Sequence, residues 1–208
     1  MNILIVDDHA VVRVGLRQLV EEAYPYAKFE EAATGREALD LLGRARWDLV
    51  ILDVNLPDQN GVDLLKVMKA QQGALPVMML SLHPEEQYAM RALRAGASAY
   101  LTKERAPEEL TTAIKRVLSG RKFITATVAE RLATVACSPA EQFPHERLSD
   151  REFQVLCAIG QGKTVSAIAN DLTLSVKTVS TYRTRLLEKL QMRSTMDLIR
   201  YTLDHALV

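Results

Sequence analysis

Short apolar runs alternate with stretches of helical periodicity along the first 120 residues of the chain. Apolar runs of this length, separated by helical patterns, are typical of buried parallel strands. The pattern predicts strands near residues 2–7, 28–32, 48–53, 76–81 and 98–102. It predicts helices near residues 10–23, 35–46, 61–72, 84–95 and 107–119.

Local signals support these element boundaries. Thr34 followed by Glu37 is typical of a capping box at the start of the second helix, and Gly120 is a stop signal after the fifth. Pro84 and Pro107 suit the first turn of the fourth and fifth helices. The apolar face expected for the fifth helix consists of Leu110, Ala113, Ile114, Val117 and Leu118. Repeated strand–helix units imply an α/β fold, a doubly wound five-stranded parallel sheet with right-handed crossovers, over residues 1–120.

The strand–helix rhythm ends after residue 120. Residues 121–146 are expected to form a linker, with a possible helix over 126–135 and an irregular, proline-containing stretch over 137–144. Phe123 and Phe143 are the aromatic residues of this linker, and we expect them to pack against a domain face.

Residues 147–208 show helical patterns only. Ser149 and Glu152 form a second capping-box signal, before a helix with Phe153, Val155, Leu156 and Ile159 on its apolar positions. A short helix follows, with Val165, Ile168, Ala169 and Leu172 expected to be buried. Ser175 is a suitable N-cap for a third helix to about Leu190, and a fourth runs from about Met196 to His205. A short helix, a tight turn and a longer helix predict a small all-α helix-turn-helix domain.

The third of these helices has two different faces. Val179, Leu186, Leu187 and Leu190 are expected to point inward. The outward face is polar, and it carries Lys177, Ser180, Thr181, Thr184 and Arg185, with Arg183 beside them. Such side chains can donate to phosphates and base edges in a DNA major groove, although a merely solvated helix face has the same composition.

Composition adds little to this picture. The chain has 26 basic and 26 acidic residues, so its net charge excludes no class of partner. Nothing in the spacing of Cys137 and Cys157 resembles a metal site or a disulfide framework, and we expect two reduced thiols. The absence of a signal peptide pattern and of a long apolar segment predicts a cytoplasmic protein without membrane contact.

Polar residues stand where the apolar strands end. Asp7 and Asp8 follow the first strand, Asp53 ends the third, Ser81 ends the fourth, and Lys103 follows the fifth. Residues at the carboxyl ends of parallel strands meet in one crevice, so these groups should converge. Repulsion between the three carboxylates would raise at least one pKa, and a bound divalent cation with a preference for oxygen ligands, such as Mg²⁺, would relieve it. The first strand is not followed by a glycine-rich loop, which argues against a dehydrogenase or a P-loop enzyme.

With these residues in place, the first 120 residues resemble the flavodoxin-like receiver domain of bacterial two-component response regulators. The match rests on Asp7-Asp8, Ser81, the Gly96-Ala97 pair, the Asp53-x3-Pro57-x3-Gly61 turn, and Tyr100-x2-Lys103. The resemblance implies that Asp53 is the phosphoacceptor and that Lys103, Ser81 and Tyr100 form the catalytic and switch set. It implies Mg²⁺ held by Asp8 and Asp53, by Asp7 through water, and by the backbone carbonyl of Asn55.

Residues 147–208 resemble the LuxR-type helix-turn-helix of the NarL/FixJ subfamily. The motif comprises Leu148-Ser149-x-Arg151-Glu152, Ile168-Ala169-x2-Leu172, Ser175-x-Lys177-Thr178-Val179-Ser180-x-Tyr182 and Lys189-Leu190. Ser180 stands where many relatives carry a lysine, so the sequence preference of those relatives does not transfer directly.

Together the two resemblances predict a DNA-binding transcription factor, not an enzyme, that a sensor histidine kinase switches by phosphorylating Asp53. We expect it to bind promoter DNA as a homodimer, with the last helix as the candidate dimer contact, and the unphosphorylated receiver to mask the recognition helix. Two alternatives stay open: a phosphatase or hydrolase that uses the same acidic site, and a phosphorylation-independent regulator in which the receiver is only a scaffold.

Overall fold

The computed structural model describes residues 1–82, 85–137, 143–205 and 207–208. The chain divides into two compact units, Met1–Ala133 and Thr134–Val208. Each unit is described by itself below. Pro84, predicted to lie in the first turn of the fourth helix, falls outside the described residues, as does part of the irregular stretch predicted for the linker.

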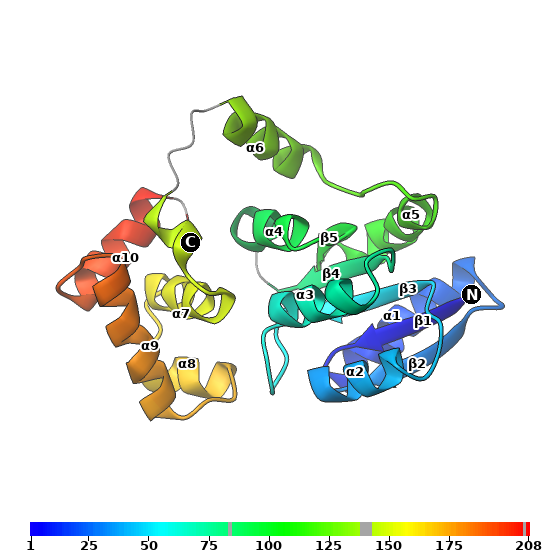
Figure 1. The fold of residues 1–208 in the computed structure, drawn as a ribbon, viewed down its shortest axis with the longest axis horizontal. Coiled ribbons are helices and arrows are strands. Elements are labelled where there is room, and N and C mark those ends of the chain that lie inside the picture. The colour runs from blue at the N-terminus through cyan, green and yellow to red at the C-terminus, as the bar shows by residue number, and fades with distance from the viewer. Residues whose placement is uncertain (83–84, 138–142, 206) are drawn as a thin grey trace. The chain divides into compact units, whose positions relative to one another are not determined.

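The first unit is built on a five-stranded parallel sheet with the order β2-β1-β3-β4-β5 (Figure 1). The predicted α/β fold is therefore confirmed. Its strands are β1 Asn2–Val6, β2 Lys28–Ala32, β3 Leu49–Asp53, β4 Val77–Ser81 and β5 Ala99–Thr102. Its helices are α1 Ala10–Ala23, α2 Gly35–Leu42, α3 Gly61–Gln71, α4 Glu85–Arg94 and α5 Ala106–Leu118.

Helices cover both faces of the sheet, which explains why its central strands β3 and β4 are apolar up to their last residues, Asp53 and Ser81. Every residue of β3 and β4 is buried, whereas most of the edge strand β2 is partly or fully exposed. On one face, α1 and α5 pack over a cluster that includes Ile5, Ile51 and Ile114. The parallel register pairs Val6 with Leu52 and Asp53 with Leu80, so that β1, β3 and β4 end close to one another.

Three local predictions for this unit need correction. The second helix ends at Leu42 and not near residue 46, because Gly43 forms its C-cap. Thr34 caps that helix, but the Glu37 carboxylate accepts from the amide of Ala33 and not from that of Thr34, so the capping box is incomplete. Leu118 is 36% exposed at the end of α5, where the helix turns its last residue away from the sheet.

The segment between the predicted domains contains more structure than expected. Phe123 forms a bridge with Ala99 beside β5 and packs against the core of the sheet, as its apolar character suggested. Helix α6 spans Ala126–Cys137, and a 3-10 turn, η1, spans Pro144–Arg147. The Phe143 ring stacks on the ring of His145, with 5.4 Å between centroids.

The second unit contains the predicted helix-turn-helix. Its helices are α7 Asp150–Gly160, α8 Val165–Asp171, α9 Val176–Lys189 and α10 Thr195–Asp204. Ser149 and Glu152 form a complete capping box at α7, and Ser175 caps α9 as predicted. Val165 is half-buried, and not buried as expected, and Leu187, which was expected to point inward, is half-buried.

Side chains connect the helices of this unit across long sequence separations. The Glu152 carboxylate, which caps α7, also accepts from Nζ of Lys189 at the end of α9, at 2.7 Å. The Tyr201 hydroxyl on α10 lies 2.9 Å from Nδ1 of His145 in η1. Among the described residues, no helix is both long enough and apolar enough to cross a bilayer.

Candidate functional site

Four of the polar residues predicted to converge, Asp7, Asp8, Asp53 and Lys103, do so at the carboxyl ends of β1 and β3. Asp7 is 1% exposed and Asp53 is 2% exposed, so both carboxyl groups are almost completely withdrawn from water. Nζ of Lys103, which follows β5, lies 2.6 Å from Oδ2 of Asp7 and 2.7 Å from Oδ2 of Asp53. One ammonium group thus bridges two carboxylates that are 46 residues apart, and this bridge defines the site.

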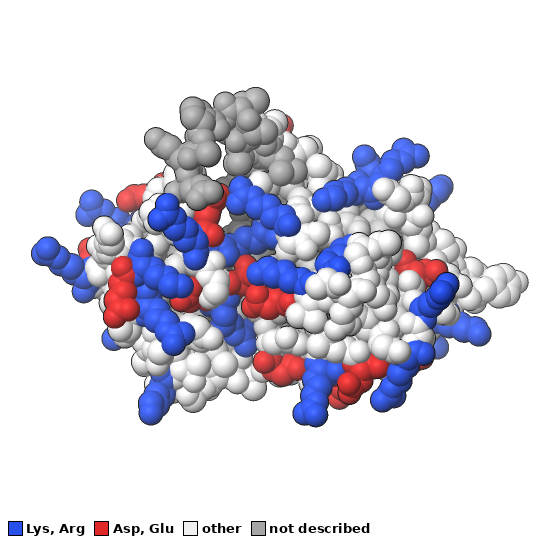
Figure 2. Space-filling model, viewed as in Figure 1, with Lys and Arg blue, Asp and Glu red and all other residues white. Residues whose placement is uncertain are grey.

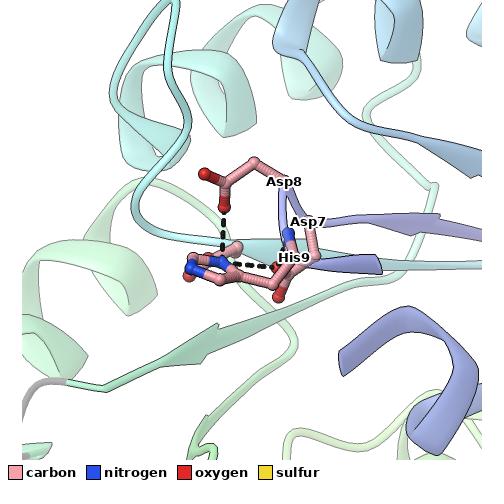
Figure 3. Close-up of side chains that lie close together, drawn as sticks. Asp7, Asp8 and His9 are labelled. Atoms are coloured by element: carbon pink, nitrogen blue, oxygen red, sulfur yellow. Dashed lines mark hydrogen bonds and ion pairs between the residues drawn. The ribbon is translucent and has the colours of Figure 1, made fainter. Parts of the chain in front are cut away.

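Asp8 lies at the mouth of the same site, where a third of its side chain is exposed (34%). The neighbouring His9 turns its ring toward both carboxylates, with Nδ1 2.7 Å from Oδ1 of Asp8 and 3.3 Å from Oδ1 of Asp7 (Figure 3). The sequence patterns did not point to His9. Its position directly after two acidic residues was the only available signal, and the direction of its ring depends on the fold.

Burial controls the charge of the central carboxylate. Desolvation raises the pKa of Asp53 from 3.8 to about 6; Lys103 opposes this shift and Asp7 adds to it. Burial alone would lower the pKa of Lys103, but its two carboxylate partners outweigh burial and raise it. One carboxyl pKa is therefore raised, as expected, but burial is the leading cause and repulsion between carboxylates is secondary.

The donor groups present fit a hard divalent cation. Potential ligand atoms of Asp7, Asp8, His9 and Asp53 all lie within 4.8 Å of one another. Three of these residues supply carboxylate oxygens, which Mg²⁺ prefers. Asn55 lies two residues after the end of β3 and donates its backbone amide to Oδ1 of Asp53 at 3.2 Å, so its backbone lies beside the carboxyl group.

Ser81 and Tyr100 lie on adjacent strands of the same sheet. The register pairs Met79 with Tyr100 and Ser81 with Thr102, and alternate residues of a strand share a face. Ser81 and Tyr100 are therefore on the same face, two register positions apart. Ser81 is fully buried and Tyr100 is 2% exposed. The amide of Lys103 donates to the carbonyl of Ser81 at 2.8 Å, which links Ser81 to the cation of the site.

Arg13 is a further residue that the sequence patterns did not select. Its Nη1 donates to the backbone carbonyl of Asp7 at 2.6 Å, and its Nε donates to Glu31 on β2 at 2.8 Å. The guanidinium therefore ties the end of β1, which carries the acidic pair, to the neighbouring strand.

Most of the predicted DNA-contacting residues lie on the exposed face of α9. Lys177, Thr181, Thr184 and Arg185 are exposed, and Ser180 is half-buried. Arg183 is also half-buried, and its Nε is buried without a hydrogen-bond partner among the described residues. Arg183 lies four residues after the buried Val179 and three before the buried Leu186, so helical spacing turns it toward the inner face.

Both threonines of this face donate their hydroxyl protons to backbone carbonyls of α9. Thr181 donates to the carbonyl of Lys177 at 3.0 Å, and Thr184 donates to the carbonyl of Ser180 at 3.1 Å. A hydroxyl has a single proton, so each threonine offers a partner only acceptor lone pairs and a methyl group.

Charge alone does not single out a binding surface. On the face shown in Figure 2, basic and acidic side chains are interspersed. This mixture agrees with a formal net charge of zero.

Comparison with known proteins agrees with both halves of this picture. Residues 3–115 match the family described as response regulator receiver domain, and residues 146–202 match bacterial regulatory proteins of the luxR family. The chain is 32% identical over 208 residues to the response regulator UvrY of Escherichia coli K12, covering 100% of this chain and 95% of that protein. It is 31% identical over 209 residues to the response regulator GacA of Pseudomonas aeruginosa, covering 100% of this chain and 98% of the relative.

A solved structure shows the same architecture. The RcsB response regulator of Salmonella typhimurium, studied for its conformational dynamism in DNA interaction, superposes with a TM-score of 0.59 at 25% identity. The superposition covers 97% of each chain.

Proposed function

The chain belongs to the response regulators that join a receiver domain to a LuxR-type DNA-binding domain, and we propose that Asp53 is the residue through which phosphorylation controls it. It is a phosphorylation-regulated transcription factor of a two-component system, with a sensor histidine kinase as its partner. The observation that carries the assignment of Asp53 is the bridge of Lys103 to Asp53 and Asp7 at the strand ends.

The chemistry of the site follows from its charges. A carboxylate oxygen of Asp53 attacks the phosphorus of a phosphohistidine or a small acyl phosphate; a new P–O bond forms as the bond to imidazole or to the acyl oxygen breaks. Lys103, already 2.7 Å from Oδ2 of Asp53, then pairs with an oxygen of the transferred phosphoryl group.

Asp8, Asp53 and the Asn55 carbonyl are the proposed ligands of Mg²⁺, with Asp7 acting through water. When bound, the ion neutralises charge on the transferring phosphoryl group. The donor set supports this, because carboxylate oxygens from two strand ends lie within reach of one cation. Asp7 keeps a second role as partner of Lys103.

Ser81 and Tyr100 are the proposed switch pair. The phosphoryl group adds negative charge and acceptor oxygens, and the Ser81 hydroxyl moves to donate to one of them. Tyr100 then occupies the space that Ser81 leaves. Their positions on one face of adjacent strands support this coupling.

The output is binding of promoter DNA by α9. Lys177, Ser180, Thr181, Thr184 and Arg185 are the proposed contacts, whereas Arg183 has a weaker claim because it turns toward the inner face. We propose that the protein acts in the cytoplasm as a homodimer. Met196 and Leu203, which are 69% and 61% exposed on α10, support the last helix as the dimer contact.

Neither alternative fits the observations as well. The relatives are regulators and not hydrolases, and the family match covers a DNA-binding domain. A scaffold receiver would have no need of a cation that bridges two buried carboxylates. If Asp53→Asn retained regulated promoter activity, this would favour a phosphorylation-independent regulator in which the receiver is only a scaffold.

The test is the intact mass of the protein after incubation with acetyl phosphate and Mg²⁺. We expect one added phosphoryl group on the wild type and none on Asp53→Asn. The DNA affinity of both proteins is then measured with and without phosphorylation. Unmodified wild-type protein in the presence of bound Mg²⁺ would contradict the proposal.

A further inference from the structure

The loop that follows β3 is attached to a helix that takes no part in the proposed chemistry. Asp58 lies in this loop, three residues after Asn55, and its carboxylate accepts from two backbone amides of α2. Oδ1 lies 2.9 Å from the amide of Gly35 and Oδ2 lies 3.0 Å from the amide of Arg36. These donors are the first two amides of the helix, which have no partner within the helix itself.

This contact completes the capping of α2 from a distant part of the chain. The Thr34 side chain satisfies the amide of Glu37, and the Thr34 carbonyl satisfies that of Ala38. Asp58 supplies the two remaining acceptors, from 22 and 23 residues away. A carboxylate is also favoured at a helix N-terminus by the helix dipole.

Two further observations show how closely the loop lies against the helix. A Cβ atom at Gly35 would lie 2.0 Å from Nε2 of Gln59, so the loop approaches the helix at a position where glycine leaves room. Within the loop, Asn55 and Asn60 form an antiparallel bridge, and the amide of Gly61 donates to the carbonyl of Val54 at 2.8 Å. The bridge joins the two ends of the loop, so a tether at Asp58 restrains Asn55 as well.

We propose that Asp58 is a positioning residue, which holds the loop that carries the Asn55 carbonyl against the N-terminus of α2 in the geometry that the metal needs. This inference rests on the proposed metal site. Without the tether, the loop must be ordered when Mg²⁺ binds, and the entropy of that ordering weakens binding. Because such coupling is reciprocal, Mg²⁺ binding also orders the first turn of α2.

Thr34→Ala provides a matched control. It removes a cap from the same helix but leaves the loop and its tether in place. Both Asp58→Ala and Thr34→Ala should lower thermal stability slightly, so stability does not distinguish them. Asp58→Asn retains one acceptor oxygen and serves as the conservative variant.

The experiment measures the Kd for MgCl2 by isothermal titration calorimetry with the full-length wild type and the three variants. We expect Asp58→Ala to weaken Mg²⁺ binding about 3- to 10-fold, Thr34→Ala to leave it within about 2-fold, and Asp58→Asn to fall between them. Hydrogen exchange should show that Mg²⁺ protects the amides of Gly35 and Arg36 in the wild type and in Thr34→Ala, but not in Asp58→Ala.

The outcomes separate this inference from the proposed function. If Asp58→Ala and Thr34→Ala have the same Kd for Mg²⁺, Asp58 only stabilises the helix and the positioning role is wrong. A wild-type protein that binds no Mg²⁺ would refute the proposed metal site, and the positioning role with it.

Discussion

At the scale of single residues, the site depends on charges that the fold withdraws from water. Asp53 and Asp7 are almost fully buried, and one ammonium group, that of Lys103, bridges both. Two carboxylates with a single cation leave an excess of negative charge, and burial makes that excess costly. Burial therefore raises the pKa of Asp53 even though Lys103 opposes that shift.

The raised pKa of Asp53 predicts a pH dependence of stability in metal-free protein. Its folded pKa of about 6 exceeds the ordinary value of 3.8, so the folded state binds more protons between these values. The free energy of unfolding should therefore fall as pH rises from about 4 to 6, by at most about 2–3 kcal/mol from this group, and stay low above pH 6.

Thermal unfolding in EDTA at pH 5 and pH 7.5 tests this dependence. Asp53→Asn should stabilise the protein more at pH 7.5 than at pH 5. Asp40→Asn, which alters an exposed carboxylate on α2, is the control and should show no such difference. An equal effect of Asp53→Asn at both values would mean that its carboxyl group titrates normally.

Lys103→Ala should separate phosphorylation from switching. Asp53 keeps its nucleophilic oxygen, so acetyl phosphate still modifies the variant, but the phosphoryl group lacks its cationic partner. We expect the mass adduct to form while the phosphorylation-dependent gain in DNA affinity is lost. A normal gain in affinity would show that Lys103 is not part of the switch.

Thr184 on α9 allows a test of how the recognition helix reads DNA. Its hydroxyl proton is donated to the Ser180 carbonyl, so the side chain offers a methyl group and acceptor lone pairs. Thr184→Val keeps a methyl at this position and Thr184→Ser keeps the hydroxyl. If a thymine methyl is the partner, the Ser variant should lose about 1 kcal/mol in DNA affinity and the Val variant less.

If Thr184→Val instead loses more DNA affinity than Thr184→Ser, the main contact is a hydrogen bond that the Thr184 hydroxyl accepts. Affinities are compared at one fixed salt concentration, because phosphate contacts depend strongly on salt. Arg185→Ala should lower the salt dependence of binding by about one unit, and Arg183→Ala by less, since Arg183 turns inward.

At the scale of elements, a residue that caps one helix can also connect it to another helix. Glu152 closes the capping box at α7 and also binds Lys189 at the end of α9, although it is only 3% exposed. The ion pair and the cap together lower the pKa of Glu152 despite the opposing effect of burial. One side chain thus connects the first helix of the second unit to its recognition helix.

Glu152→Gln should destabilise the second unit by about 1–2 kcal/mol, since it weakens the cap and removes the charge facing Lys189. Chemical denaturation of the full chain measures this loss. Lys189→Ala is the matched variant and should cost at least as much, because it leaves the buried Glu152 carboxylate without its cationic partner. Unchanged stability of Glu152→Gln would show that the charge facing Lys189 contributes nothing, since glutamine can still accept from the Ser149 amide.

At the scale of the whole molecule, the structure bears on where a DNA-binding fragment should begin. The pattern places this start at residue 147, but Phe143 and His145 contact the last helix. Nδ1 of His145 lies 2.9 Å from the Tyr201 hydroxyl, and the Phe143 ring lies 5.2 Å from that of His205. We therefore expect a fragment of residues 143–208 to melt several degrees higher than one of residues 147–208.

The longer fragment is the right reagent for testing whether the receiver restrains DNA binding. If the unphosphorylated receiver masks the recognition helix, the fragment should bind promoter DNA more tightly than the unphosphorylated full-length chain. Gel-shift titrations of both proteins compare the two affinities. Equal affinities would exclude masking and favour control through dimerisation.

Local patterns determined the elements of this protein. Strand positions, the helix-turn-helix and the caps at Ser149 and Ser175 all follow from short-range periodicity and backbone hydrogen bonding, which act within a few residues. The set of polar residues at strand ends also followed from the sequence, because parallel strands end on the same side of a sheet.

Only the tertiary structure decided how distant groups meet. The bridge from Lys103 to Asp7 and Asp53, the direction of the His9 ring, the inward turn of Arg183 and the tether from Asp58 to α2 each depend on the packing of several elements. The cause of the raised pKa of Asp53 belongs to the same class. Desolvation depends on every element that covers a group, and no pattern of neighbouring residues along the chain contains that information.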